Sequence, residues 1–180
     1  AFGRAIQYFH AAIGFEPENR EAKTELAAIY WNKFIEAEKM GDEASVSYYE
    51  RLIRQYGEKS YDFLLEGKGS IELQSDPPGA TVTMYRLQES DRQLVTREAK
   101  DLGKTPVKIK NIEMGSYLFI FNSLENPDLR ETRYPVYISR NEDHKGKVRL
   151  FKSRDIGEGF VHVPAGYSII GGDKKAKDSL

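Results

Sequence analysis

Three histidines are the side chains in this chain best suited to acid–base or metal chemistry, at positions 10, 144 and 162. His144 follows an Asn-Glu-Asp sequence at positions 141–143, whose donors could bind a metal ion together with the imidazole. The same residues are typical of a polar hairpin tip, which is the structure we expect there. Glu158 and His162 are four residues apart, but the glycines flanking Glu158 disfavour the helix that would align them. The histidines therefore predict no metal site.

Acidic and hydroxyl side chains also form no recognisable catalytic pattern. The 28 aspartates and glutamates fall mostly where helix surfaces or turns would expose them, and no two stand out as an acid/base pair. Serines and threonines occur in turns without a His/Asp partner pattern. The chain has no cysteine, which excludes disulfides, thiolate metal sites and cysteine nucleophiles. We expect no catalytic residue, no cofactor and no metal.

The composition is that of an ordinary globular protein. Hydrophobic residues make up 39% of the 180 positions and charged residues 31%, with 11 tyrosines and 9 phenylalanines, whereas disordered chains are poor in aromatics. The formal net charge is -1, and the only tight lysine cluster, at Lys174, Lys175 and Lys177, is expected to be a solvated tail, so we expect no nucleic-acid partner.

No apolar run approaches the roughly 18 residues of a membrane span, so we expect no membrane insertion. No signal peptide is visible. The chain starts without Met on a helical pattern, so we expect a piece of a longer protein.

The first 65 residues have the periodicity of α-helices. Ala5, Phe9 and Ala12 lie on one face of a first helix. The second helix carries an apolar stripe that consists of Ala22, Leu26, Ile29, Tyr30, Phe34 and Ala37. The third is predicted to bury Ala44, Tyr48, Leu52 and Tyr56. The residues expected to end or cap these helices are Pro17, Asn19, Gly41 and Asp42. Short turns force the three helices into antiparallel packing.

After residues 66–70 the pattern changes to alternation with period two, which is typical of half-buried strands. Alternating apolar residues occur near positions 71–73, 82–84, 107–109, 117–121, 134–138 and 148–150. Turn signals separate these runs. Several short strands at this spacing predict an antiparallel β-sandwich. The fold class is therefore α+β in two parts, antiparallel helices followed by a β-sandwich.

The helical part resembles a tetratricopeptide repeat, with Ala5, Phe9, Ala12 and Pro17 at the small–aromatic–small–proline positions of one repeat. Leu26, Ala27 and Tyr30 fit the first helix of the next repeat, after which the match departs; a generic helical hairpin is the alternative. Such repeats bind peptides on their concave face, and the resemblance places that face at Glu21, Thr24, Ala28, Trp31 and Asn32. Trp31 could anchor an interface, but we expect its ring to contact the β-domain or an adjacent helix.

The β-part resembles the PEGA domain. Its signature matches Pro77, Pro78, Gly79 and Ala80, with Pro78 where the family has Glu. Two further elements follow in the family's order, and they consist of Gly103, Thr105 and Pro106, and of Gly115 at the start of a strand. The chain departs from the family pattern in two polar segments, 87–100 and 123–132, which are expected to be inserted loops. These residues are expected to be structural, because Gly79 supplies a positive φ in a tight turn and Pro106 begins a strand without needing an N–H. The resemblance implies an extracytoplasmic location, periplasmic or on the cell surface; the residues alone leave the compartment open.

The last stretch, residues 159–172, is similar to the opening of a formylglycine-generating-enzyme (sulfatase-modifying factor) domain, which implies a truncated third module. The predicted domains are a tetratricopeptide-like fragment at 1–65, a PEGA sandwich at 70–155, and a linker with the start of the third module at 156–180. This arrangement resembles the regulatory region of bacterial serine/threonine protein kinases. No kinase motif is present.

These resemblances imply a non-catalytic interaction and spacer segment of a multidomain bacterial signalling protein, with a serine/threonine kinase as the expected parent and a protein or peptide as the expected partner. The resemblances also allow a carbohydrate as the ligand. The competing hypothesis is an accessory part of a formylglycine-type enzyme or of a carbohydrate-binding surface protein.

Overall fold

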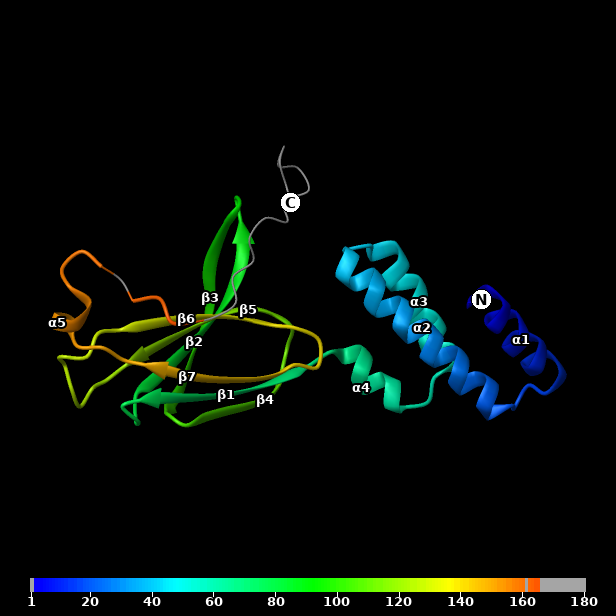
Figure 1. The fold of residues 1–180 in the computed structure, drawn as a ribbon, viewed down its shortest axis with the longest axis horizontal. Coiled ribbons are helices and arrows are strands. Elements are labelled where there is room, and N and C mark those ends of the chain that lie inside the picture. Colours follow the sequence, from blue (N-terminus) through cyan, green and yellow to red (C-terminus); the bar gives the residue numbers. More distant parts are fainter. Residues whose placement is uncertain (1, 161, 166–180) are drawn as a thin grey trace. The chain divides into compact units, whose positions relative to one another are not determined.

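The structure is a computed structural model that describes residues 2–160 and 162–165 (Figure 1). The chain divides after Gly67 into two compact units, the first helical and the second built mainly of strands. This confirms the predicted order of helices followed by strands. Most of the C-terminal motif at 159–172 and the lysines at 174, 175 and 177 lie outside the described residues. No helix in the described part of the chain has the length and apolar character needed to cross a membrane.

The helical unit consists of α1 (Phe2–Phe15), α2 (Arg20–Met40), α3 (Glu43–Tyr56) and α4 (Ser60–Glu66). The predicted caps are present: the Asn19 side chain accepts from the backbone N–H of Ala22 at 2.9 Å, and Asp42 accepts from that of Ser45 at 3.1 Å. Gly41 has a φ of 66°, the left-handed conformation that ends α2. The fourth helix, α4, was not predicted.

The core of the helical unit confirms the predicted stripe of α2 and corrects that of α3. Leu26, Tyr30 and Phe34 are buried between the helices, with Ile53 of α3 and Leu65 of α4. The face predicted for α3 is rotated in the structure. Leu52 and Tyr56 pack against the core as predicted, together with Val46, Tyr49 and Ile53, whereas Ala44 is exposed and Tyr48 is 49% exposed. The reason is aromatic packing, because the rings of Tyr49 and Tyr56 both lie about 6 Å from that of Tyr30.

The second unit is a sandwich of two sheets around one core. Its strands are β1 (Gly69–Asp76), β2 (Thr81–Ser90), β3 (Gln93–Lys104), β4 (Val107–Ile112), β5 (Gly115–Asn122), β6 (Thr132–Ile138) and β7 (Asp143–Arg149), followed by the short helix α5 (Ser153–Ile156). The three-stranded sheet has the order β4-β1-β7 and the four-stranded sheet the order β3-β2-β5-β6. Both sheets contribute buried side chains to the shared core, among them Ile71, Leu73, Val82, Phe119, Phe121, Ile138 and Val148.

The prediction of a wholly antiparallel sandwich is wrong for one pair of strands. β7 runs parallel to β1, with Ser70 opposite Asp143 and Asp76 opposite Arg149. A half-buried strand shows the same alternation whichever way its neighbour runs, so the sequence pattern does not report strand direction.

One of the two predicted loop insertions is instead part of the sheet. Residues 87–100 continue β2 and β3 as a two-stranded ribbon, which Figure 1 shows extending past the other strands of the sandwich. β2 pairs with β5 only as far as Arg86, but with β3 as far as Ser90. Asp91 and Arg92, with φ of 52° and 62°, make the turn. The second insertion, 123–132, is mostly irregular, as predicted.

We expect the substitution Gly69→Ala to lower the free energy of unfolding of the β-unit by about 1–3 kcal/mol, because an added Cβ would lie 2.5 Å from the carbonyl oxygen of Glu142. Backbone amide hydrogen exchange in β1 would measure the loss. Gly14→Ala in α1 is the matched control, since its Cβ would meet nothing within 4 Å and should instead stabilise the helix by about 0.5–1 kcal/mol. Unchanged exchange protection in Gly69→Ala would contradict this packing.

Candidate interaction surfaces

The predicted peptide-binding face lies along α2, but the ring of its tryptophan packs against other rings of the helical unit. Glu21, Thr24 and Asn32 are exposed, and Ala28 is half-buried. The Trp31 ring stacks on Phe34, with ring centroids 5.4 Å apart, and meets the ring of Tyr61 on α4 edge-on at 6.1 Å. Trp31 therefore contributes to packing on an adjacent helix, while the remaining polar residues present a carboxylate, a hydroxyl and an amide.

Each of the three described histidines has a structural contact, and the ring of His162 lies 4.5 Å from that of Phe151. The Nε2 atom of His10 lies 3.1 Å from the hydroxyl of Tyr30, and that of His144 lies 3.1 Å from the hydroxyl of Tyr134. Burial raises the pKa of both tyrosine hydroxyls, which keeps them protonated near neutral pH. The Nδ1 atom of His144 faces a carboxylate oxygen of Glu142 at 3.3 Å. Within the described ranges, no three metal-ligating side chains gather at one point.

Two of the PEGA-like elements meet in a hydrogen-bonded cluster, which we call the turn clasp and which consists of Ser75, Pro77, Gly79, Ala80 and Thr105. The N–H groups of Gly79 and Ala80 donate to the hydroxyls of Thr105 (3.0 Å) and Ser75 (3.3 Å). The Ser75 hydroxyl donates to the carbonyl of Pro77 at 2.7 Å. Because the Ser75 hydroxyl proton already forms this hydrogen bond, the Thr105 hydroxyl must be the donor in the 2.6 Å contact between the two hydroxyls. A backbone bond from Thr105 N–H to the carbonyl of Ala80, at 2.9 Å, completes the clasp.

The other residues of the PEGA-like motifs also have backbone roles. Gly103, with φ of 79°, donates its N–H to the side chain of Asp101 at 2.9 Å, and Gly115, with φ of 139°, begins β5. A side chain at either position would be strained. Pro78 is exposed, and Pro106 immediately precedes β4, where no ladder hydrogen bond is lost.

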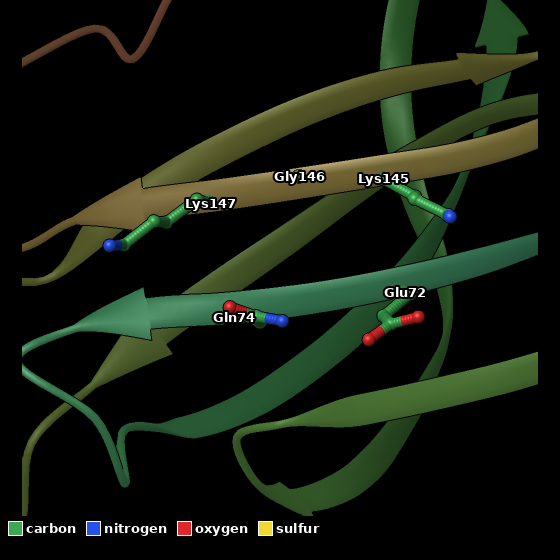
Figure 2. A pocket seen from close by; sticks show the side chains of 5 residues that line it. All are labelled: Glu72, Gln74, Lys145, Gly146 and Lys147. Carbon is green, nitrogen blue, oxygen red and sulfur yellow. The ribbon is translucent and has the colours of Figure 1, made fainter.

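An open depression of about 380 Å³ lies on the outer face of the three-stranded sheet. Figure 2 shows its lining, in which Glu72 and Gln74 come from β1 and Lys145, Gly146 and Lys147 come from β7. The side chains of Glu72, Gln74, Lys145 and Lys147 face outward because their neighbours along each strand point into the core. Gly146 is one of those inward positions, where a Cβ would lie 2.9 Å from the hydroxyl of Tyr134, so only its backbone lines the depression. No sequence motif marks these residues as a group.

Positive charge predominates in this depression. The Nζ atom of Lys108, on β4, lies 3.2 Å from a carboxylate oxygen of Glu72. This hydrogen bond lowers the pKa of Glu72, and the charge of Lys145 lowers it further. Lys147 lies opposite the uncharged Gln74 in the β1–β7 register. The depression is suited to contact with an anion, while its one carboxylate is already paired.

A smaller depression of about 200 Å³ is lined by Asp128, Lys152, Ser153 and Arg154, at the start of α5. Its walls are held together by backbone contacts, among them the N–H of Ser153 donating to the carbonyl of Asp128 at 3.0 Å. Its mixed charges give it no clear ligand preference.

Comparison with known proteins does not assign the chain to a family. No protein-family model matches it, and no curated protein matches it. Among solved structures, it has a distant likeness to the crystal structure of (S)-allantoin synthase, with a TM-score of 0.30 and 10% sequence identity. The likeness covers 65% of this chain and 58% of that one, so less than two thirds of the length of that protein is matched. A likeness this distant supports no conclusion about fold or activity.

We expect Thr105→Val to lower the free energy of unfolding by about 1–3 kcal/mol, because the half-buried Gly79 N–H would lose its acceptor and the buried Ser75 hydroxyl would lose one of its hydrogen bonds. Urea denaturation followed by circular dichroism would measure the change. Thr105→Ser keeps the hydroxyl and is the control. Equal losses in the two variants would show that the methyl group of Thr105 matters rather than its hydrogen bonds.

The pairing of Glu72 with Lys108 predicts a titration that can be measured directly. Carbon NMR of the Glu72 carboxyl should give a pKa below the ordinary glutamate value, and Lys108→Gln should raise it. Because the folded-state pKa is the lower one, the ion pair stabilises the fold above the unfolded-state pKa, and this contribution is lost as the pH falls through the folded-state pKa.

Lys110→Gln on the same strand is the control for this titration, since Lys110 lies opposite Ser70 rather than Glu72. An equal rise in the pKa of Glu72 in both variants would mean that the general field of the face, and not the pair, sets its value.

Proposed function

We propose that this chain is a non-catalytic interaction and spacer segment of a multidomain bacterial signalling protein, a serine/threonine protein kinase. In this proposal residues 1–65 are a tetratricopeptide-like repeat fragment and residues 70–155 a PEGA-type sandwich. Residues 156–180 lead into a formylglycine-generating-enzyme-like module. The expected partner is a protein or peptide.

The observation that carries the proposal is the turn clasp. The motif residues that give the β-unit its resemblance to PEGA lie far apart in the sequence, yet Gly79, Ala80 and Thr105 are joined by hydrogen bonds. The polar groups of the clasp bond to one another, which supports a structural role for these motifs. Because the motif residues maintain the fold and do not form a reactive site, they support a role as a spacer or binding scaffold rather than as an enzyme.

Support for binding comes from the polar face of α2. Glu21, Thr24 and Asn32 are exposed on one side of a helix whose other side is buried in the core. A rigid helix with unoccupied hydrogen-bonding groups can hold a peptide in one register, because the core fixes the position of each side chain.

A phosphotransfer assay tests the absence of catalysis. With ATP and Mg²⁺, the purified chain is expected to transfer no phosphate to a generic protein substrate and to release none above the background of buffer alone. ATP turnover that co-purifies with the folded chain would overturn the proposal.

Selection from a displayed peptide library tests the α2 face in the same protein. Peptides selected on the chain should lose affinity about threefold or more for the double variant Thr24→Ala/Asn32→Ala, which removes a hydroxyl and an amide. Ser47→Ala/Gln55→Ala on α3 removes the same groups from another exposed surface and is the matched control. If the affinity of the selected peptides falls in neither double variant, or falls equally in both, the α2 face is not their binding site.

A further inference from the structure

The outer face of the three-stranded sheet concentrates positive charge in a chain whose net charge is -1. Its outward-facing cations are Lys108 and Lys110 on β4, and Lys145, Lys147 and Arg149 on β7. We propose that β7 and the depression beside it bind an extended acidic segment of another polypeptide, in which acidic residues alternate with uncharged ones. This proposal names a partner chemistry for the interaction role proposed above and rests on that role.

Local pairing compensates the charge of β7 only in part, since Lys145 lies opposite Glu72 and Arg149 opposite Asp76, but Lys147 lies opposite an uncharged residue. Glu72 bonds to Lys108, and Asp143 accepts a hydrogen bond from the hydroxyl of Ser70. Over the residues that the structure describes, Lys147 forms no ion pair and has Gln74 as its cross-strand neighbour. An incoming carboxylate near Lys147 would therefore meet two ammonium groups and an amide, while Glu72, the carboxylate that lines the depression, already bonds to Lys108.

The spacing of the cations along β7 matches that of an extended peptide. Lys145, Lys147 and Arg149 occupy alternate positions, so successive charges point to the same side at intervals of about 7 Å. A peptide in the β-conformation presents every second side chain at the same interval. Because β7 lies at the edge of its sheet, such a peptide can run beside it and place one carboxylate near each cation.

The same face is less suited to a nucleic acid. Glu72, Asp76 and Asp143 are interspersed among its cations, whereas nucleic-acid binding needs a continuous basic surface. The competing explanation is that lysines on an edge strand only prevent sheets from joining edge to edge. That explanation predicts no bound ligand.

Fluorescence anisotropy with two labelled peptides tests the proposal. One peptide alternates glutamate with threonine, and the other has the same composition with its glutamates contiguous. The alternating peptide should bind more tightly, and its affinity should fall when the salt is raised to about 0.3 M. Lys145→Gln/Lys147→Gln should weaken its binding about fivefold or more, and Glu72→Gln should strengthen it by removing the only carboxylate in the depression.

Arg97→Gln/Lys100→Gln on β3 removes the same charge from another exposed strand and should leave the affinity unchanged. Circular dichroism of every variant verifies that the fold is retained. The proposal is overturned if neither peptide binds, if both bind equally, or if the two double variants weaken binding equally. Tighter binding of a single-stranded oligonucleotide or of anionic lipid vesicles through the same lysines also overturns it. None of these outcomes affects the phosphotransfer and α2-face tests, which decide the wider proposal separately.

Discussion

The hydrogen bond between the hydroxyls of Ser75 and Thr105 joins two of the four connections through which the chain passes between the sheets of the sandwich. The chain leaves the three-stranded sheet between β1 and β2 and returns to it between β3 and β4. Both passages lie in the turn clasp, where the Ser75 and Thr105 hydroxyls are buried and meet at 2.6 Å. Tying the two turns together places β1 beside β4 in one sheet and β2 beside β3 in the other. The order of four of the seven strands thus depends on two small polar side chains whose hydrogen bonds are mutually satisfied.

This register determines what each face of the three-stranded sheet presents. With β1 between β4 and β7, Ile71 and Leu73 enter the core while Glu72 and Gln74 face outward. Glu72 then lies opposite Lys108 on one side and Lys145 on the other. A shift of one residue would turn every one of these side chains to the other face. The charge pattern of the surface is therefore a consequence of the same turns that hold the core together.

The sequence predicts the features that depend on local chemistry and misses those that depend on pairing. The stripe of α2 and its caps follow from residue spacing, as do most of the strands. The α4 helix has no such signal, because Lys59 at its start provides no side-chain cap. The β2–β3 ribbon turns on Asp91 and Arg92, both in left-handed conformations, and Arg92 stands where such hairpin turns usually have glycine. Neither the direction of β7 nor the rotation of α3 can be read from periodicity, since both are decided by neighbours distant in the sequence.

The two candidate binding surfaces also differ in how far the sequence predicts them. The α2 face follows from helical spacing, but the sequence alone could not decide whether Trp31 is exposed, because its partner Tyr61 belongs to the unpredicted helix. The sequence pattern did not identify the first half of β7 as a strand, because its inward residues His144 and Gly146 are not apolar and break the usual alternation. The outward position of its lysines was therefore not predicted. Those two inward residues are suited to the interior because Tyr134 fills the space beneath them, bonding to His144 and leaving no room for a side chain at position 146. The outward charge of β7 can therefore be recognised only when its inward packing against β6 is known.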